Sequence, residues 1–213
     1  TDKVAYGRYL VQNMDCYGCH SPDFTTMNLL EPEKTPGYMS GGNTLLDLKG
    51  RPVKTANLTA DDETGIGKWS EADFVRALTK GFAPGNRTIR YPMGIMPLSD
   101  QEAGAIYAYL RTVPPIRNAV ARTPGETAPA GSSAGKQLYY SYGCVSCHGE
   151  TGAGVGDLRK AAEHFPQDAQ LEQWLRHAPQ VKLETRMPGW EGVIRDEDYA
   201  PLIAYVRELS ASH

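Results

Sequence analysis

Two segments of the chain have the pattern of a capped amphipathic helix. Residues 99–102 lead into an apolar stripe at 106–111, and residues 195–198 lead into a similar stripe at 202–207. Each segment starts with cap-like and acidic residues, which suit the N-terminal end of a helix, and continues with apolar positions on one face. The pattern predicts a helix at the end of each half of the chain. Packing into a core is sufficient to explain its apolar face.

Two further helix starts are predicted in the first half. Asp2 precedes a segment in which Tyr6 and Leu10 are four residues apart, which is the spacing of one helical face. Asp2 is therefore the expected N-cap of a first helix. Ser70 is the expected N-cap of another helix, because a serine hydroxyl can accept a hydrogen bond from a free N–H group of the first turn.

Two loop segments carry weaker signals. Residues 41–46 and 52–56 flank the polar residues 49–51 and predict a short hairpin. The glycine-rich residues 152–156 lack the G-x-G-x-x-G spacing of a phosphate-binding loop, and they predict a flexible turn.

The chain also contains an internal repeat. All four cysteines fall in two copies of the pattern C-x-x-C-H, which are 128 residues apart. Under that offset, three positions upstream of the first copy align with similar residues upstream of the second: Gly7 with Gly135, Arg8 with Lys136, and Leu10 with Leu138. Each half thus has the order helix, cysteine motif, middle segment, terminal helix.

A segment rich in proline, glycine and serine separates the two halves. Residues 112–134 contain Pro114-Pro115, Pro124, Pro129 and Gly131-Ser132-Ser133. This composition is typical of a linker. We expect a first domain at residues 1–115, a linker at 116–131 and a second domain at 132–213.

The repeated motif is typical of covalent haem attachment. In each copy the cysteine pair can form thioethers to the two haem vinyl groups, and the adjacent histidine can coordinate the iron. The expected covalent residues are Cys16, Cys19, Cys144 and Cys147, and the expected axial ligands are His20 and His148. Zinc binding and disulfide bonds are the alternatives. Neither explains why a histidine follows the second cysteine twice.

A methionine thioether on the far side of the iron would close each site and raise its reduction potential. Met187 is the only methionine of the second half and is the expected ligand there. In the first half Met93 and Met96 both remain candidates. We favour Met93, because it lies seven residues before Asp100 and leaves more chain to turn into the terminal helix than the four residues after Met96.

The chain resembles class I bacterial cytochromes c over nearly its whole length. The segment 92–100 (PMGIMPLSD) is similar to the Pro-Met ligand segment of small monohaem members, which supports Met93. The first half further resembles the cytochrome subunits of membrane-bound alcohol and aldehyde dehydrogenases, at residues 7–11, 56–59, 64–70 and 105–115. Those relatives usually have Met-Pro at the ligand followed by a longer loop, and they carry three haems. The resemblance implies an all-α fold with two tandem haem-wrapping domains, two covalently bound haems c, and assembly in the periplasm.

Composition narrows the function further. The 213 residues carry a net charge of −3 and have a mean hydropathy of −0.46. This balance argues against nucleic-acid binding and favours redox protein partners with a basic docking patch. No apolar run approaches the roughly 18 residues of a membrane span. The start of the sequence lacks the pattern of a signal peptide. Earlier removal of a signal peptide or membrane anchor stays an open alternative.

The expected function is single-electron transfer between a donor dehydrogenase and an oxidase or other acceptor. Two alternatives remain at this point. A dihaem enzyme, such as a peroxidase or a thiosulfate-oxidising cytochrome, would need an open, histidine-filled or cysteine-filled distal position. A ligand sensor would need a weakly bound methionine that yields to CO or NO.

Overall fold

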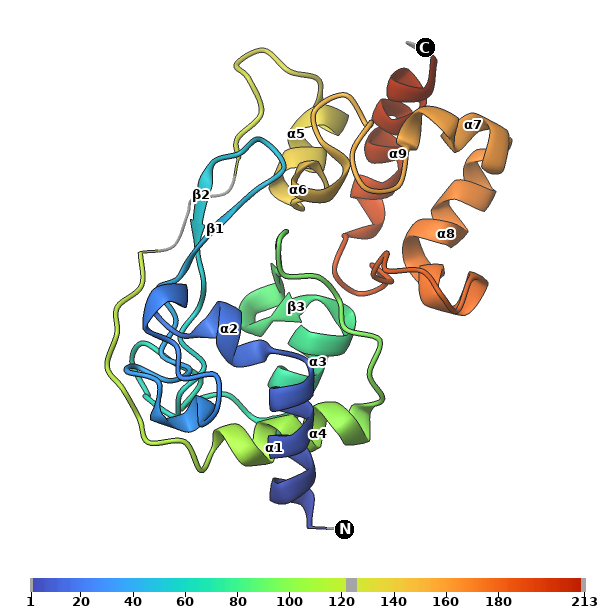
Figure 1. Ribbon diagram of the computed structural model, residues 1–213. Coiled ribbons are helices and arrows are strands. Elements are labelled where there is room, and N and C mark those ends of the chain that lie inside the picture. Colours follow the sequence, from blue (N-terminus) through green and yellow to red (C-terminus); the bar gives the residue numbers. More distant parts are fainter. Residues whose placement is uncertain (1, 122–125, 212–213) are drawn as a thin grey trace. The chain divides into compact units, whose positions relative to one another are not determined.

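The computed structural model describes residues 2–121 and 126–211, so the predicted linker residue Pro124 lies outside the described part. The described residues divide into two compact units. The first comprises residues 2–85 and 96–121, and the second comprises residues 86–95 and 126–211. Helices make up most of the regular secondary structure in both units, as predicted (Figure 1). Within the described ranges, every helix is too short or too polar to cross a lipid bilayer.

The longer helices of the first unit start where the sequence predicts. The helices are α1 (Lys3–Asn13), α2 (Cys16–His20), α3 (Glu71–Lys80) and α4 (Asp100–Leu110). The Asp2 carboxylate accepts a hydrogen bond from the N–H group of Val4, which confirms it as the N-cap of α1. Ser70 and Ser99 each form a capping box with an acidic residue three positions later. These caps satisfy N–H groups that have no acceptor inside the helix.

A close helix crossing forms the core of the first unit. Gly7 of α1 lies against the backbone of α4, so close that a Cβ atom added to it would be 1.9 Å from the carbonyl oxygen of Ala105. The lack of a side chain at Gly7 is what permits the approach. Apolar side chains from both helices and from the adjoining segments are buried around the crossing, among them Leu10, Val11, Ile66, Phe74, Ile106 and Leu110.

The predicted hairpin is present in the middle segment. Strand β1 (Thr44–Leu46) pairs antiparallel with β2 (Pro52–Lys54), and Leu45 lies opposite Val53. The Asp47 carboxylate accepts hydrogen bonds from the N–H groups of Lys49 and Arg51, which closes the turn. Short 3₁₀ turns η1 (Phe24–Thr26) and η2 (Pro32–Lys34) precede the hairpin, and β3 (Phe82–Ala83) and η3 (Pro84–Asn86) follow α3.

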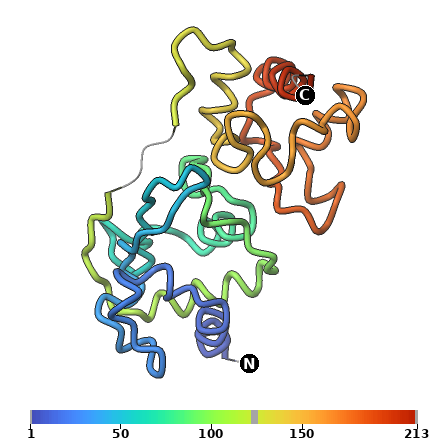
Figure 2. The backbone as a smooth tube through the Cα atoms, turned by 45° about the horizontal axis from the view of Figure 1, so that its top comes forward, coloured from blue at the N-terminus to red at the C-terminus, as the bar shows by residue number. Residues whose placement is uncertain are grey.

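The second unit repeats the same crossing. Its elements are β4 (Arg87–Thr88), α5 (Ala134–Ser141), α6 (Val145–His148), η4 (Leu158–Lys160), α7 (Ala161–His164), α8 (Asp168–Val181) and α9 (Asp196–Ala211). A Cβ atom added to Gly135 of α5 would be 2.0 Å from the carbonyl oxygen of Pro201 in α9. The aligned glycines of the repeat, Gly7 and Gly135, therefore have the same structural task. Figure 2 follows the irregular loop of residues 182–195 that joins α8 to α9.

A segment from between α3 and α4 belongs to the second unit. In residues 86–95 the Thr88 hydroxyl donates a hydrogen bond to the carbonyl oxygen of Tyr142 at 3.0 Å. Tyr142 directly precedes Gly143 and the second cysteine motif. The sequence pattern contains no signal for this association, because a single side-chain-to-backbone hydrogen bond over 54 residues leaves no periodicity.

Candidate functional site

The first cysteine motif forms one helical turn. Helix α2 consists of the five motif residues. It is preceded by Asp15, whose backbone is in the left-handed region at φ 53°. Because an α-helix turns once in 3.6 residues, Cys16 and Cys19 lie on the same side of α2. Both side chains are half-buried and neither forms a disulfide bond. The turn therefore presents two thiols together, as attachment to one porphyrin edge requires.

The histidine of this motif is buried and fixed by the backbone. His20 is 9% exposed, and its Nδ1 lies 2.8 Å from the carbonyl oxygen of Ala56, just after the hairpin. A carbonyl oxygen can only accept, so Nδ1 carries the proton and Nε2 keeps its lone pair. Burial lowers the pKa of His20, which favours the neutral ring. A neutral imidazole oriented in this way is the form that binds a metal ion.

The second motif repeats the arrangement with a different acceptor. Nδ1 of His148 lies 2.8 Å from the carbonyl oxygen of Gly156, and burial lowers the pKa of His148 as well. The loop of residues 152–156 folds back onto the motif, because the N–H group of Gly154 donates to the carbonyl oxygen of His148 at 2.9 Å. A Cβ atom on Gly154 would be 2.3 Å from the carbonyl oxygen of Cys147. The glycines that predicted a turn thus serve to orient the histidine.

The residues at both motifs fit a covalently bound haem. Among residues 2–121 and 126–211, His, Cys, Asp and Glu form no group of three or more that could hold a metal ion, so the zinc alternative has no site in the described structure. All four cysteines are free, so the disulfide alternative is wrong. Thr55 directly precedes Ala56, and its buried hydroxyl has no hydrogen-bond partner within the described residues. A buried polar group left unpaired is expected where a bound group is to supply the partner.

The candidate methionines occupy different parts of the chain. Met187 is half-buried in the α8–α9 loop, and its N–H group donates to the Thr185 hydroxyl at 3.1 Å. Met96 belongs to the first unit, where its N–H group donates to the carbonyl oxygen of Leu78 at 2.9 Å. Met93 is half-buried in the segment 86–95, which belongs to the second unit. The first unit thus contains Met96 together with the first motif, and the second contains Met187 together with the second.

Comparison with protein families decides the class of the molecule. A family model described as Cytochrome c matches residues 4–114, which is more than half of the chain. The chain belongs to the cytochrome c family. A second model, described as cytochrome c oxidase, cbb3-type, subunit III, matches residues 130–206 of this cytochrome. The two matches lie in tandem, one over each cysteine motif, as the repeat predicts.

Individual relatives of the cytochrome are cytochrome subunits of dehydrogenases. It is 29% identical over 178 residues to the gluconate 2-dehydrogenase cytochrome c subunit of Pantoea cypripedii, and 27% identical over 180 residues to the fructose dehydrogenase cytochrome subunit of Gluconobacter japonicus. It is also 28% identical over 172 residues to the cytochrome c subunit of the quinone-dependent alcohol dehydrogenase of Gluconobacter oxydans. These alignments include 76%, 71% and 73% of the cytochrome but only 39%, 34% and 34% of the respective relatives. The predicted resemblance to dehydrogenase cytochrome subunits is confirmed, and with it the prediction of an electron carrier rather than a catalytic subunit.

Sequence reasoning missed the two groups that orient the histidines. Both are main-chain carbonyl groups, of Ala56 and Gly156, and a carbonyl is present at every position of a chain. One indirect signal was available for Gly156, since a glycine-rich run directly after a C-x-x-C-H motif implies a backbone that must come close to it.

Proposed function

We propose that this cytochrome carries two haems c and passes single electrons from a dehydrogenase to an acceptor protein in the periplasm. The observation that supports two haems is the duplicated histidine geometry: in each unit the imidazole Nδ1 lies 2.8 Å from a backbone carbonyl, which frees Nε2 for iron. The periplasm is proposed from the resemblance to class I bacterial cytochromes c. The dehydrogenase donor is proposed because three of the relatives are named as cytochrome subunits of dehydrogenases.

The residues have separate tasks in this proposal. Cys16 and Cys19 would hold the first haem and Cys144 and Cys147 the second, each pair through two thioether bonds. Haem c, when bound, supplies an iron that accepts and releases one electron. The protein keeps each histidine neutral and aligned before the iron arrives, so that little reorganisation accompanies ligation.

The haem count is tested by mass and by absorption. The mass of the purified chain should exceed that of the polypeptide by two haems, and the pyridine haemochrome spectrum should give two haems per chain. Cys144→Ala combined with Cys147→Ala should halve the haem content and leave the first haem in place. One haem per chain in the unaltered protein would overturn the two-haem proposal.

The distal ligands are tested on the near-infrared band that methionine bound to ferric haem produces. We propose Met187 for the second haem, so Met187→Ala should remove half of that band. For the first haem we propose Met93, and Met93→Ala should remove the other half. Met96 is the alternative. It belongs to the same unit as His20, and its N–H group donates there to the carbonyl oxygen of Leu78. If Met96→Ala removes half of the band while Met93→Ala leaves the band intact, the proposed ligand of the first haem is wrong.

A carrier also differs from an enzyme or a sensor in its ligand chemistry. With both irons closed by thioethers, the ferrous protein should not bind CO, and hydrogen peroxide should not be turned over. Rapid CO binding at either haem, or peroxide turnover, would contradict the carrier proposal.

A further inference from the structure

A proline leaves a free hydrogen-bond acceptor inside α8. Pro179 has no N–H group, so the carbonyl of Leu175, four residues earlier, has no partner from within the helix. The helix is kinked at His177, whose φ and ψ are −131° and 31°. The N–H group of Trp190 donates to the Leu175 carbonyl oxygen at 3.0 Å, and that of Glu191 donates to the Arg176 carbonyl oxygen at 3.3 Å. The kinked helix thus binds the loop that joins it to α9.

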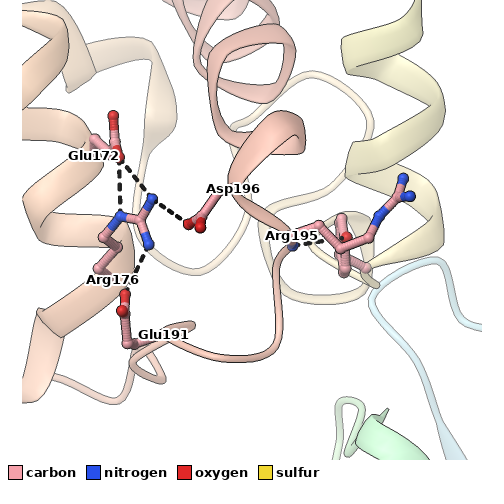
Figure 3. A network of polar contacts seen from close by, with 6 residues as sticks. Glu172, Arg176, Glu191, Arg195 and Asp196 are labelled. Atoms are coloured by element: carbon pink, nitrogen blue, oxygen red, sulfur yellow. Dashed lines mark hydrogen bonds and ion pairs between the residues drawn. The ribbon is translucent and has the colours of Figure 1, made fainter.

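The side chain of Arg176 strengthens the same connection. Figure 3 shows its guanidinium between three carboxylates: Glu172 of α8 at 2.9 Å, Glu191 of the loop at 2.9 Å, and Asp196 at the start of α9 at 2.8 Å. The guanidinium also stacks on the ring of Tyr199 in α9, with 3.9 Å between its carbon and the ring centre.

Several features make this cluster more than an exposed ion pair. Arg176 is only 19% exposed and forms hydrogen bonds with all three carboxylates. Isolated surface pairs contribute little, whereas a partly buried arginine that pairs several times and stacks on an aromatic ring contributes more. One side chain therefore joins a helix, a loop and the start of the next helix.

Met187 lies between the two ends of this loop. The hydrogen bonds on its N-terminal side are local, since Thr185 bonds to Lys182 and Met187 bonds to Thr185. Apart from the bond of Lys182 to Ala178 at the end of the helix, the hydrogen bonds that attach the loop to α8 start at Trp190, three residues after Met187. The bonds of Trp190 and Glu191 therefore fix the C-terminal side of the methionine relative to α8.

We propose that Arg176 is a positioning residue, which holds the loop of residues 182–195 against α8 and thereby strengthens the bond between Met187 and the second haem iron. This inference rests on the proposed function, in which Met187 is the distal ligand. Loosening the cluster lets the loop open more often. An external ligand reaches the iron only in the opened state. The affinity for such a ligand therefore measures how strongly the Arg176 contacts favour the closed loop.

The test is displacement of the methionine by imidazole in the ferric, fully loaded protein. Loss of the near-infrared band is followed as imidazole is added, and Met187→Ala identifies which half of the band belongs to the second haem. Arg176→Gln should raise the imidazole affinity of that haem about tenfold, which corresponds to about 1.4 kcal/mol. The affinity of the first haem should not change.

Arg207→Gln is the matched control. Arg207 in α9 also pairs with a carboxylate of α8, Asp168 at 2.9 Å, and is similarly shielded at 22% exposed. That pair lies at the first residue of α8, far along the helix from Leu175 and Arg176. The control should lower stability without changing imidazole affinity by more than about twofold, because it leaves the α8 contacts of the loop in place. Equal increases from both arginine substitutions would reduce Arg176 to a structural role and overturn the proposal.

Two further variants separate the possible failures. If Arg176→Gln lowers the helix content, Glu191→Gln removes one arm of the cluster more gently, and it should raise the imidazole affinity about threefold. Arg176→Lys keeps the positive charge but loses the planar guanidinium that pairs with several carboxylates. Its imidazole affinity should therefore lie between those of the unaltered protein and Arg176→Gln. If Met187→Ala leaves the whole band intact, the ligand assignment fails. If it removes half of the band while neither Arg176→Gln nor Glu191→Gln changes imidazole affinity, only the positioning role fails.

Discussion

The helix crossing at Gly7 supports a quantitative prediction. In Gly7→Ala the new Cβ atom would start 1.9 Å from the carbonyl oxygen of Ala105, and α1 and α4 must separate by about 1.5 Å to restore an ordinary contact of 3.4 Å. The obstacle is backbone and cannot rotate away. Overpacking of this kind costs about 3 kcal/mol at the upper end of its usual range. Alanine offsets about 1 kcal/mol of this, because it has the higher helix propensity. We expect a net loss of about 2 kcal/mol.

Gly104→Ala is the matched control for this prediction. Gly104 is also a buried helical glycine, but its added Cβ atom would meet the carboxylate oxygen of Glu71 at 2.5 Å. That oxygen ends a flexible side chain, 48% exposed, which can move aside. We expect Gly104→Ala to change stability by less than about 1 kcal/mol in either direction.

Urea titration of the haem-loaded protein, followed by helix circular dichroism, measures both changes. A loss of about 2 kcal/mol should also lower the melting temperature of a unit of this size by roughly 8–16 °C. Equal stability of Gly7→Ala and the unaltered protein would refute the close crossing. Equal losses from Gly7→Ala and Gly104→Ala would refute the distinction between backbone and side-chain obstacles.

Three further outcomes are expected. Asn57→Leu should destabilise the first unit by about 3 kcal/mol in a urea titration. The buried Asn57 amide donates to the Ile116 carbonyl oxygen at 2.8 Å, and its removal would leave the partners unpaired. A loss below about 1 kcal/mol would contradict this expectation. Ser99→Ala should cost about 1 kcal/mol through loss of the α4 cap, whereas Ser99→Asp should retain most of it. The Tyr142 hydroxyl lowers the pKa of Asp198 below its usual value of 3.8, so the stabilisation is present above pH 3.8 and is lost as the pH falls below it. Unfolding titrations at about pH 6 and about pH 3 should show a smaller acid loss in Asp198→Asn than in the unaltered protein, and equal losses would count against the paired carboxylate.

Local signals in the sequence were sufficient for much of the fold. The caps at Asp2, Ser70 and Ser99 are confirmed, because an N-cap depends on side chains and N–H groups only two or three residues apart. The hairpin is confirmed for a similar reason, since its two strands are joined by a five-residue turn whose polar residues are visible in the chain. The glycine pair of the repeat was also visible, although its role depends on contacts between helices that are far apart in the sequence.

Features that depend on distant backbone groups were not predictable in the same way. Residues 86–95 join the second unit through Thr88, and no pattern in their sequence distinguishes them from the rest of the middle segment. In α8 a proline ordinarily signals the end of a helix, whereas here the helix continues through a kink and its freed carbonyl binds Trp190. The candidate haem-binding residues were readable because haem attachment demands fixed residue types at fixed spacing. The backbone carbonyls that orient the histidines can belong to any type of residue, so only their position in the fold matters.

The two histidine acceptors lie at unequal distances along the chain, and this difference bears on how the sites assemble. Gly156 is eight residues from His148, whereas Ala56 is 36 residues from His20 and follows a complete hairpin. Closing the longer loop in an unfolded chain costs about 1.3 kcal/mol more entropy. The imidazole of the second half can therefore be aligned by a short stretch of chain. That of the first half must wait for its middle segment to fold.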